Sequence, residues 1–261
     1  MKLNIVPART GALWVKLGVQ TFARQPLALA GLFFMFLSVM SVASLLPWIG
    51  NALALAILPG ATLGLMAATR EASKGKFPMP SILVSAFRAG RQRARAMLVL
   101  GVLYAMGFLL VLGISALVDG GSFAQLYLAG GTLTREMILA PEFQYAMWVA
   151  MGLYLPLSLL FWHAPALVHW HGISPVKSLF FSLVACMKNF WAFTVFGLVW
   201  LAVFMTVGLV IAVLAGSLGS PGLLASIMFP AAMLMAAMFF TSIYFTFRDS
   251  FVAPEAEGDT P

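Results

Sequence analysis

Six long apolar runs separated by polar positions dominate the pattern of this chain. The runs cover approximately 27–46, 51–68, 96–118, 146–168, 191–214 and 222–247. About 20 apolar residues in a helix can cross a hydrocarbon core of roughly 30 Å, and backbone polar groups inside that core must bond within the segment. None of the runs alternates at every second position, as a membrane β-strand does. The pattern therefore predicts an all-α, polytopic bundle of six transmembrane helices.

Three amphipathic stretches precede the first, third and fifth runs and extend this picture. Each leads to a basic residue followed by an amide, with a small residue six positions before the basic one. The pairs are Arg24-Gln25, Arg91-Gln92 and Lys188-Asn189, and the small residues are Gly18, Ser85 and Ser182. In the first stretch Lys16, Gln20 and Arg24 form a polar line at spacing four. Such helices lie in the membrane interface with the apolar side down, so we expect about three interfacial helices.

The repeats suggest how the chain is organised. We expect one integral membrane domain over 1–247, made of three helix–span–span units at about 10–68, 79–118 and 174–247, with the fourth span at 146–168. The segment 119–144 is the only sizeable piece predicted on the external side, where it either caps the spans or meets a partner. The sequence from 248 to 261 is acidic and contains two prolines, which predicts a disordered tail.

Composition and charge agree with this layout. The chain is 62% hydrophobic and 9% charged, whereas about 25% of a soluble domain is charged. Fourteen of its fifteen Lys and Arg residues fall on one side of the predicted spans, and only Arg135 falls on the other. The positive-inside rule then places both termini in the cytoplasm. No short apolar region with a cleavage site precedes Leu27, so we expect the first span to remain uncleaved.

The spans carry few groups suited to chemistry. Ionisable residues inside a membrane usually mark function, but no Asp, Glu, Lys or Arg lies at mid-depth in the six runs. No catalytic or nucleotide-binding motif is present, and no nucleic-acid recognition module accompanies the net charge of +7. Cys186 is the only cysteine, which excludes an intrachain disulfide. We therefore expect no enzymatic activity, no cofactor and no nucleic-acid partner.

The prolines and glycines inside the spans have two interpretations. Pro59 is followed by Gly60 and Gly64, at the spacing that lets helices approach closely. Pro230 interrupts the sixth run. Each proline removes one helical hydrogen bond, and the result is either a tolerated kink or a gating hinge.

All three histidines fall within residues 159–172. On a helix, His163 and His169 are six steps of about 100° apart and face different directions, which does not suit a metal or haem site. Pro165 predicts a bend in the fourth span, and Gly172 predicts the end of its helix. We expect His163 to be a satisfied polar residue within the bundle.

The basic residues at span entrances also allow two interpretations. Long cationic side chains reach the headgroup region and orient the protein, or they hold anionic lipid headgroups or a substrate. The candidate lipid or substrate contacts are Arg24, Arg91, Arg93, Arg95, His163, Lys188 and Asn189.

A family resemblance rests on short motifs near the fourth span. Trp162-His163-Ala164-Pro165-Ala166-Leu167-Val168 closes that span, and Ser174-Pro175 and Lys188-Asn189 follow in order. In these features the chain resembles an uncharacterised family of six-span inner-membrane proteins, mostly from proteobacteria. The resemblance covers most of the chain except the acidic tail. It implies this fold and a bacterial inner-membrane location, and it brings no settled activity. The position of His163 is variable in that family and commonly apolar or aromatic.

These observations favour an integral inner-membrane protein without catalytic activity that acts in scaffolding or in membrane and envelope homeostasis. The alternative is a permease or channel for a small or lipid-like substrate. The expected partners are the lipid bilayer, including anionic headgroups, and another membrane protein.

Overall fold

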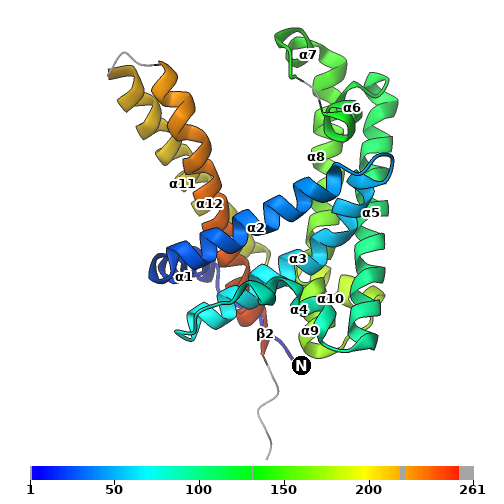
Figure 1. The fold of residues 1–261 in the computed structure, drawn as a ribbon, viewed down its shortest axis with the longest axis vertical. Helices are drawn as coiled ribbons and strands as arrows, with labels where there is room; N and C mark the ends of the chain where they lie inside the picture. The colour runs from blue at the N-terminus through cyan, green and yellow to red at the C-terminus, as the bar shows by residue number, and fades with distance from the viewer. Residues whose placement is uncertain (1, 131, 218–220, 253–261) are drawn as a thin grey trace, which may run out of the picture. The chain divides into compact units, whose positions relative to one another are not determined.

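The computed structural model describes residues 2–130, 132–217 and 221–252, and these residues are almost entirely helical (Figure 1). The helices are α1 (Thr10–Arg24), α2 (Pro26–Ser44), α3 (Gly50–Ser73), the 3-10 helix η1 (Pro80–Val84), α4 (Ser85–Arg88), α5 (Arg91–Asp119), α6 (Ser122–Ala129), α7 (Arg135–Leu139), α8 (Pro141–Phe161), α9 (Ala164–His171), α10 (Pro175–Lys188), α11 (Phe190–Ser217) and α12 (Pro221–Ser250). Two short strands, β1 (Lys2–Leu3) and β2 (Phe251–Val252), pair antiparallel.

Six helical segments of the described residues are long and apolar enough to cross a membrane. They are Pro26–Ser44, Gly50–Ser73, Arg91–Asp119, Pro141–His171, Phe190–Ser217 and Ser226–Ser250. The shortest has 19 residues, which span about 28 Å at 1.5 Å per residue. Each segment coincides with one predicted run, so the six-span, all-α prediction is confirmed. Several helices continue into polar sequence; α5, for example, begins at Arg91 and not at the apolar boundary near residue 96.

One compact unit contains the described residues within 1–36, 62–85 and 184–261. In it α11 and α12 run side by side, and α1 packs against both (Figure 1). The backbones approach closely: a Cβ on Gly11 would lie 2.1 Å from the carbonyl oxygen of Ala192, and one on Gly18 would lie 2.5 Å from the Cβ of Ser242. The apolar side of α1, with Trp14, therefore faces protein and not lipid, while Lys16, Gln20 and Arg24 are exposed as the polar line predicts.

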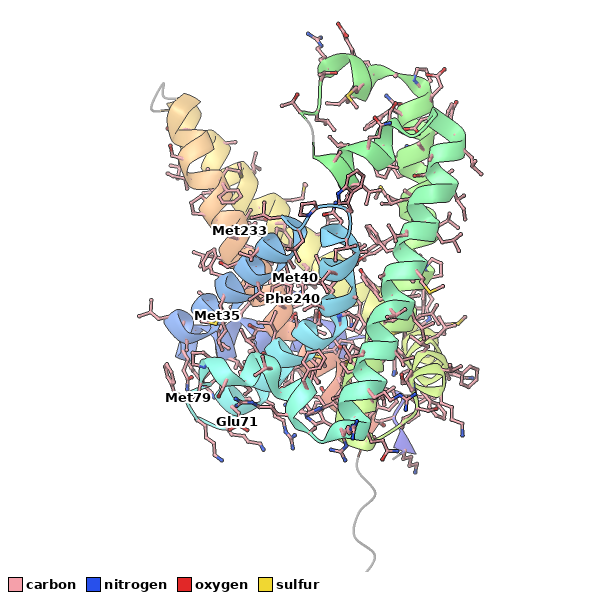
Figure 2. The ribbon with its side chains drawn as sticks, turned by 45° about the vertical axis from the view of Figure 1, so that its right-hand side comes forward. Met35, Met40, Glu71, Met79, Met233 and Phe240 are labelled. Atoms are coloured by element: carbon pink, nitrogen blue, oxygen red, sulfur yellow. The ribbon has the colours of Figure 1, made fainter. Side chains whose placement is uncertain are left out.

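Aromatic side chains join α2 to α12 within the same unit. Phe240 of α12 is labelled in Figure 2. Its ring centroid lies 5.5 Å from that of Phe33 and 5.9 Å from that of Phe36. Phe33 and Phe36 are buried. Tilted and edge-to-face pairs at such distances contribute about 0.5–1.5 kcal/mol beyond the area that they bury. The start of the first span is thus fixed against the sixth.

The other compact unit contains residues 37–61 and 86–183. Here α5 and α8 lie side by side, α6 packs on both, and α7 contacts α8 (Figure 1). The side chain of Asp119 caps α6, because its two oxygens accept from the backbone N–H of Gly121 at 2.9 Å and of Phe123 at 2.7 Å. This packing of the 119–144 segment corresponds to the first of its two predicted roles, a cap on the spans.

The amphipathic stretches differ in form. The first and third are the continuous helices α1 and α10, and α10 begins at Pro175. The middle one is broken into η1 and α4, and Gly90 with φ of 103° separates it from α5. The predicted disordered tail needs correction at its start, because Arg248–Ser250 complete α12 and Phe251–Val252 form β2. Residues 253–261, where the rest of that prediction falls, lie outside the described residues.

The intramembrane prolines have unequal effects. The helices α3, α8 and α12 continue through Pro59, Pro156 and Pro230, whereas the fourth span breaks between Phe161 and Ala164, just before Pro165. Gly172, with φ of 65°, ends α9. The bend at Pro165 and the helix end at Gly172 are both confirmed.

The glycines that follow Pro59 are approached closely by the η1–α4 segment. A Cβ on Gly64 would lie 2.7 Å from the Cα of Leu83, and one on Gly60 would lie 3.0 Å from the ring of Phe87. The small-residue spacing therefore accommodates this short segment against α3.

Candidate functional sites

The break in the fourth span is closed by a serine from α10. The hydroxyl of Ser182 accepts from the backbone N–H of His163 at 2.9 Å and donates to the carbonyl oxygen of Leu159 at 2.8 Å. In an uninterrupted helix that N–H would donate directly to that carbonyl. Ser182 is fully buried, so its hydroxyl satisfies two backbone groups that a break would leave exposed to a dry interior.

His163 lies at this break and is fully buried, with no exposed surface. Pro165 follows in the first turn of α9, where its missing N–H removes no intrahelical bond. The other two histidines, His169 and His171, lie in the last turn of α9 and are partly exposed. Within residues 2–130, 132–217 and 221–252, no three His, Cys, Asp or Glu side chains are grouped so that they could hold a metal ion.

Asn189 belongs to a second polar site, which joins the N-terminal segment to the end of the sixth span. Its side-chain oxygen accepts from the backbone N–H of Val6 at 2.8 Å, and its amide nitrogen donates to the carbonyl oxygen of Asn4 at 3.0 Å and to the hydroxyl of Ser250 at 3.4 Å. Asn189 is 2% exposed. The chain thus uses this candidate residue for internal bonds, and we name the site the terminal clasp: Asn4, Trp14, Asn189, Asp249 and Ser250.

The indole of Trp14 and the carboxylate of Asp249 form the charged part of the terminal clasp. The indole Nε1 donates to Oδ2 of Asp249 at 2.9 Å, and Nε of the neighbouring Arg248 lies 2.7 Å from Oδ1. The guanidinium of Arg248 also stacks over the ring of Phe245 at 4.9 Å from its centroid. Trp14 is fully buried, so its bond to the carboxylate lies in a drier setting than the half-exposed ion pair and contributes more.

The remaining predicted contact residues stay at the surface. Arg24 and Lys188 end α1 and α10 and are exposed. Arg91, Arg93 and Arg95 occupy the first turns of α5 and are exposed as well. Such placement suits both interpretations, orientation by the headgroup region and binding of anionic headgroups.

Cys186 on α10 is buried, in contrast to the neighbouring Met187 and Lys188. Burial raises the pKa of its thiol to about 12, because an apolar setting disfavours the thiolate. The side chain is thus a small apolar filler in the packed face of α10.

Two apolar cavities lie beside the first half of α8, the first among α5, α6 and α8 and the second among α6, the α7 region and α8. The first, of about 250 Å³, is lined by Phe108, Val111, Leu112, Phe123, Tyr127, Ala150, Met151 and Tyr154. The second, of about 460 Å³, is lined by Phe123, Leu126, Tyr127, Leu133, Ile138, Phe143, Gln144, Met147 and Trp148. No charged side chain lines either cavity.

Sequence reasoning did not predict the cavities or the residues that complete the two polar sites. Ser182 carried a signal, because it lies six residues before the basic position of the third repeat. Asp249 also carried a signal in the sequence, because it is a carboxylate two residues after the end of the sixth apolar run. Asn4 and Phe123 carried none, since their contacts depend on segments distant in sequence.

The comparisons with known proteins agree with a membrane location. A protein of Burkholderia thailandensis named "Probable inner membrane protein" is 40% identical over 258 residues, which cover 98% of this chain and 96% of that protein. No protein-family model matches the chain, and no solved structure matches it. At 98% of the chain, the match includes all six spans. The chain therefore belongs to the family of this inner-membrane protein and is itself a multi-pass protein of the inner membrane.

Proposed function

We propose that the protein is a non-catalytic scaffold of the inner membrane that holds a second membrane protein in place, with both termini in the cytoplasm. One observation carries the proposal. The buried polar residues Asn189 and Ser182 bond segments of their own chain: Asn189 fixes residues 4–6 and Ser250, and Ser182 fixes the break between Leu159 and His163. Polar groups occupied in this way rigidify a bundle and are not available to a substrate.

A face of α11 supports the proposal and suggests where a partner would contact the protein. Gly208, Ala212 and Gly216 follow one another at spacing four, and a Cβ on either glycine would meet nothing within 4 Å. α11 is also the least buried of the six spans. Small residues at this spacing let a helix of another protein approach the backbone closely.

The test is chemical crosslinking in native membranes with a reagent that does not act through disulfide bonds. The crosslinked protein is then purified in a mild detergent. We expect one partner protein in constant ratio to the chain, and we expect the Gly208→Leu and Gly216→Leu variants to lose it. Gly31→Leu is the matched control, because a Cβ on Gly31 also meets open space. Repeated recovery of the chain alone, or equal recovery of the partner with all three variants, would contradict the scaffold proposal.

Orientation can be tested separately with reporter fusions at Pro261. The C-terminus falls on the side of the predicted spans that carries fourteen basic residues, and the positive-inside rule supports a cytoplasmic position for that side. We expect a fluorescent protein fused there to fluoresce and a periplasm-dependent phosphatase fused there to be inactive. The opposite pair of results would overturn this orientation.

A carrier of lipid-like substrates is the second candidate, and the two apolar cavities are the observation that favours it. A carrier moves its substrate across the midplane, so reconstituted protein should speed the exchange of fluorescent phospholipid between leaflets. An exchange rate equal to that of empty vesicles would eliminate this candidate and would leave the scaffold proposal untouched.

A further inference from the structure

The two apolar cavities share one wall. Phe123 and Tyr127 of α6 line both, and their rings are 5.2 Å apart between centroids. Tyr127 also packs edge-on against Phe108 of α5 at 6.3 Å, and Phe108 packs edge-on against Tyr154 of α8 at 5.9 Å. An aromatic frame from three helices thus surrounds a space that the chain itself does not fill.

This aromatic frame lies within one leaflet of the membrane. Phe108 and Leu112 precede the end of α5 at Asp119 by eleven and seven residues, which places them about 10–16 Å below that end. Met151 and Tyr154 lie five and eight residues after residue 146, where the fourth apolar run begins, which is about 8–12 Å along α8. A hydrocarbon core of roughly 30 Å has leaflets of about 15 Å, so the cavities lie in the leaflet on the side of α6.

The rim of the first cavity is open. Met151 is 54% exposed and Tyr154 is 42% exposed, on a helix that spans the membrane. The polar groups around the two cavities are tyrosine hydroxyls, the Gln144 amide and the Trp148 indole, and the amide already donates to the carbonyl oxygen of Ile138 at 2.8 Å. Apolar cavities of this kind do not hold water, and a helix, about 10–12 Å across, is too wide for a space of about 250 Å³.

We propose that the cavities are a binding site for a phospholipid of the leaflet on the α6 side, with an acyl chain lying among Phe108, Phe123 and Tyr127. The occupant follows from the surroundings, because the rim opens on the face that the spans present to the bilayer. An acyl chain is flexible, apolar and narrow enough for the space. Aromatic walls give it a larger contact area than the ridged surface of an ordinary lipid-facing helix does. A lipid-binding site is an addition to the proposed scaffold function, and the protein can bind a lipid there without transporting it across the membrane.

The test uses a phospholipid with a photoreactive group at the end of one acyl chain, incorporated with the protein into lipid nanodiscs. Irradiation is followed by mapping of the labelled residues. Met151 at the rim and Leu201 on α11 are both 54% exposed, so random contact with lipid labels them equally. We expect labelling of the cavity residues, Met151 included, to exceed labelling of Leu201 by about tenfold, the ratio given by roughly 1.4 kcal/mol of preference.

Two variants make the test specific. Ala150→Phe fills the first cavity, and we expect it to reduce cavity labelling to the level at Leu201. Because Ala150 is buried and this variant can fail to fold, Tyr127→Ala is the second one: it removes the shared wall at a residue that is 59% exposed. Tyr145→Ala is its matched control, because Tyr145 is 64% exposed and lines neither cavity. We expect Tyr127→Ala to reduce labelling and Tyr145→Ala to leave it unchanged.

Three outcomes would overturn the proposal. The first is equal labelling of Met151 and Leu201. The second is cavity labelling that Tyr127→Ala and Tyr145→Ala change to the same extent. The third is labelling by a photoreactive free fatty acid but not by the phospholipid, which would identify a different occupant.

Discussion

The hydroxyl of Ser182 bridges the backbone N–H of His163 and the carbonyl oxygen of Leu159, at 2.9 Å and 2.8 Å. In an unbroken helix these two backbone groups would bond to each other directly. The serine belongs to α10, 19 residues beyond the histidine. The interruption of the fourth span is thus stabilised by a side chain of α10. That side chain bonds to backbone groups of His163 and Leu159, which no substitution at those two positions removes.

Removing this hydroxyl should destabilise the protein. We expect Ser182→Ala to lower the free energy of unfolding by about 1–3 kcal/mol, because a buried donor and acceptor lose their partner. Thermal or denaturant unfolding in detergent measures the change. Ser158→Ala is the control: its exposed hydroxyl bonds only to the carbonyl oxygen of Leu155 in its own helix, so a change within about 0.5 kcal/mol is expected. Equal effects of the two variants would contradict the bridging role.

The bond between Trp14 and Asp249 should appear as coupling in a double-mutant cycle. We expect Trp14→Phe and Asp249→Ala to destabilise the protein singly, and their combination to cost less than the sum by about 1.5–3 kcal/mol, the range for a hydrogen bond to a charged group. A cycle of Trp14→Phe with Glu142→Ala, at an exposed residue, should be additive. Additivity in both cycles would show that the indole–carboxylate bond contributes nothing to stability.

Cys186 should resist thiol reagents while the protein is folded. Its pKa of about 12 leaves about one thiol in ten thousand ionised at pH 8, and the thiolate is the reactive form. We expect a maleimide to label the detergent-solubilised native protein very slowly and the denatured protein rapidly. A Lys177→Cys, Cys186→Ala variant, with its thiol at an exposed position of the same helix, should be labelled in both states. Rapid labelling of native Cys186 would contradict its burial.

The raised pKa of Cys186 also fixes the sign of a pH effect. The pKa of the thiol in the folded protein lies above its ordinary value of 9.0. Above about pH 9 the unfolded chain therefore binds fewer protons than the folded chain, and stability falls as the pH rises towards 12. We expect part of this decline to disappear in Cys186→Ala, as measured by unfolding between pH 8 and pH 11. An identical decline in both proteins would assign it to other groups.

Two glycines of α5 should respond to alanine in opposite directions. A Cβ on Gly101 would lie 1.9 Å from the carbonyl oxygen of Ala56, whereas one on Gly113 would meet nothing within 4 Å. We expect Gly101→Ala to destabilise the protein by about 1–3 kcal/mol through overpacking, and Gly113→Ala to stabilise it by up to about 1 kcal/mol. Unfolding in detergent compares the two. Similar effects would mean that α3 and α5 are not in backbone contact.

Local and periodic signals were enough to predict the spans and the ends of several helices. The runs of about 20 apolar residues set the six spans, and Pro165 and Gly172 act on the backbone within one turn of their own position. The exposed line of Lys16, Gln20 and Arg24 follows from spacing alone.

Contacts between distant segments could not be predicted in this way. The apolar face of α1 indicates only that something apolar covers it, and periodicity does not distinguish lipid from α11 and α12. Asn189 was expected among lipid contacts because it follows a basic residue, but it bonds Asn4 and Val6, which are more than 180 residues away in sequence. The cavities depend on how α6 packs against α5 and α8. The eight residues of α6 do not reveal from their sequence where that short helix packs.

The pairing of β1 with β2 has a consequence for biosynthesis. Lys2 and Leu3 pair with Val252 and Phe251, which the ribosome adds about 250 residues later, and α1 packs on α11 and α12, which are also made long after it. At about 5–20 residues per second, the N-terminal segment waits roughly 12 to 50 s for those partners. During that time the apolar side of α1 is uncovered, so the nascent chain needs the membrane surface or an insertion factor to shield it until α11 and α12 are made.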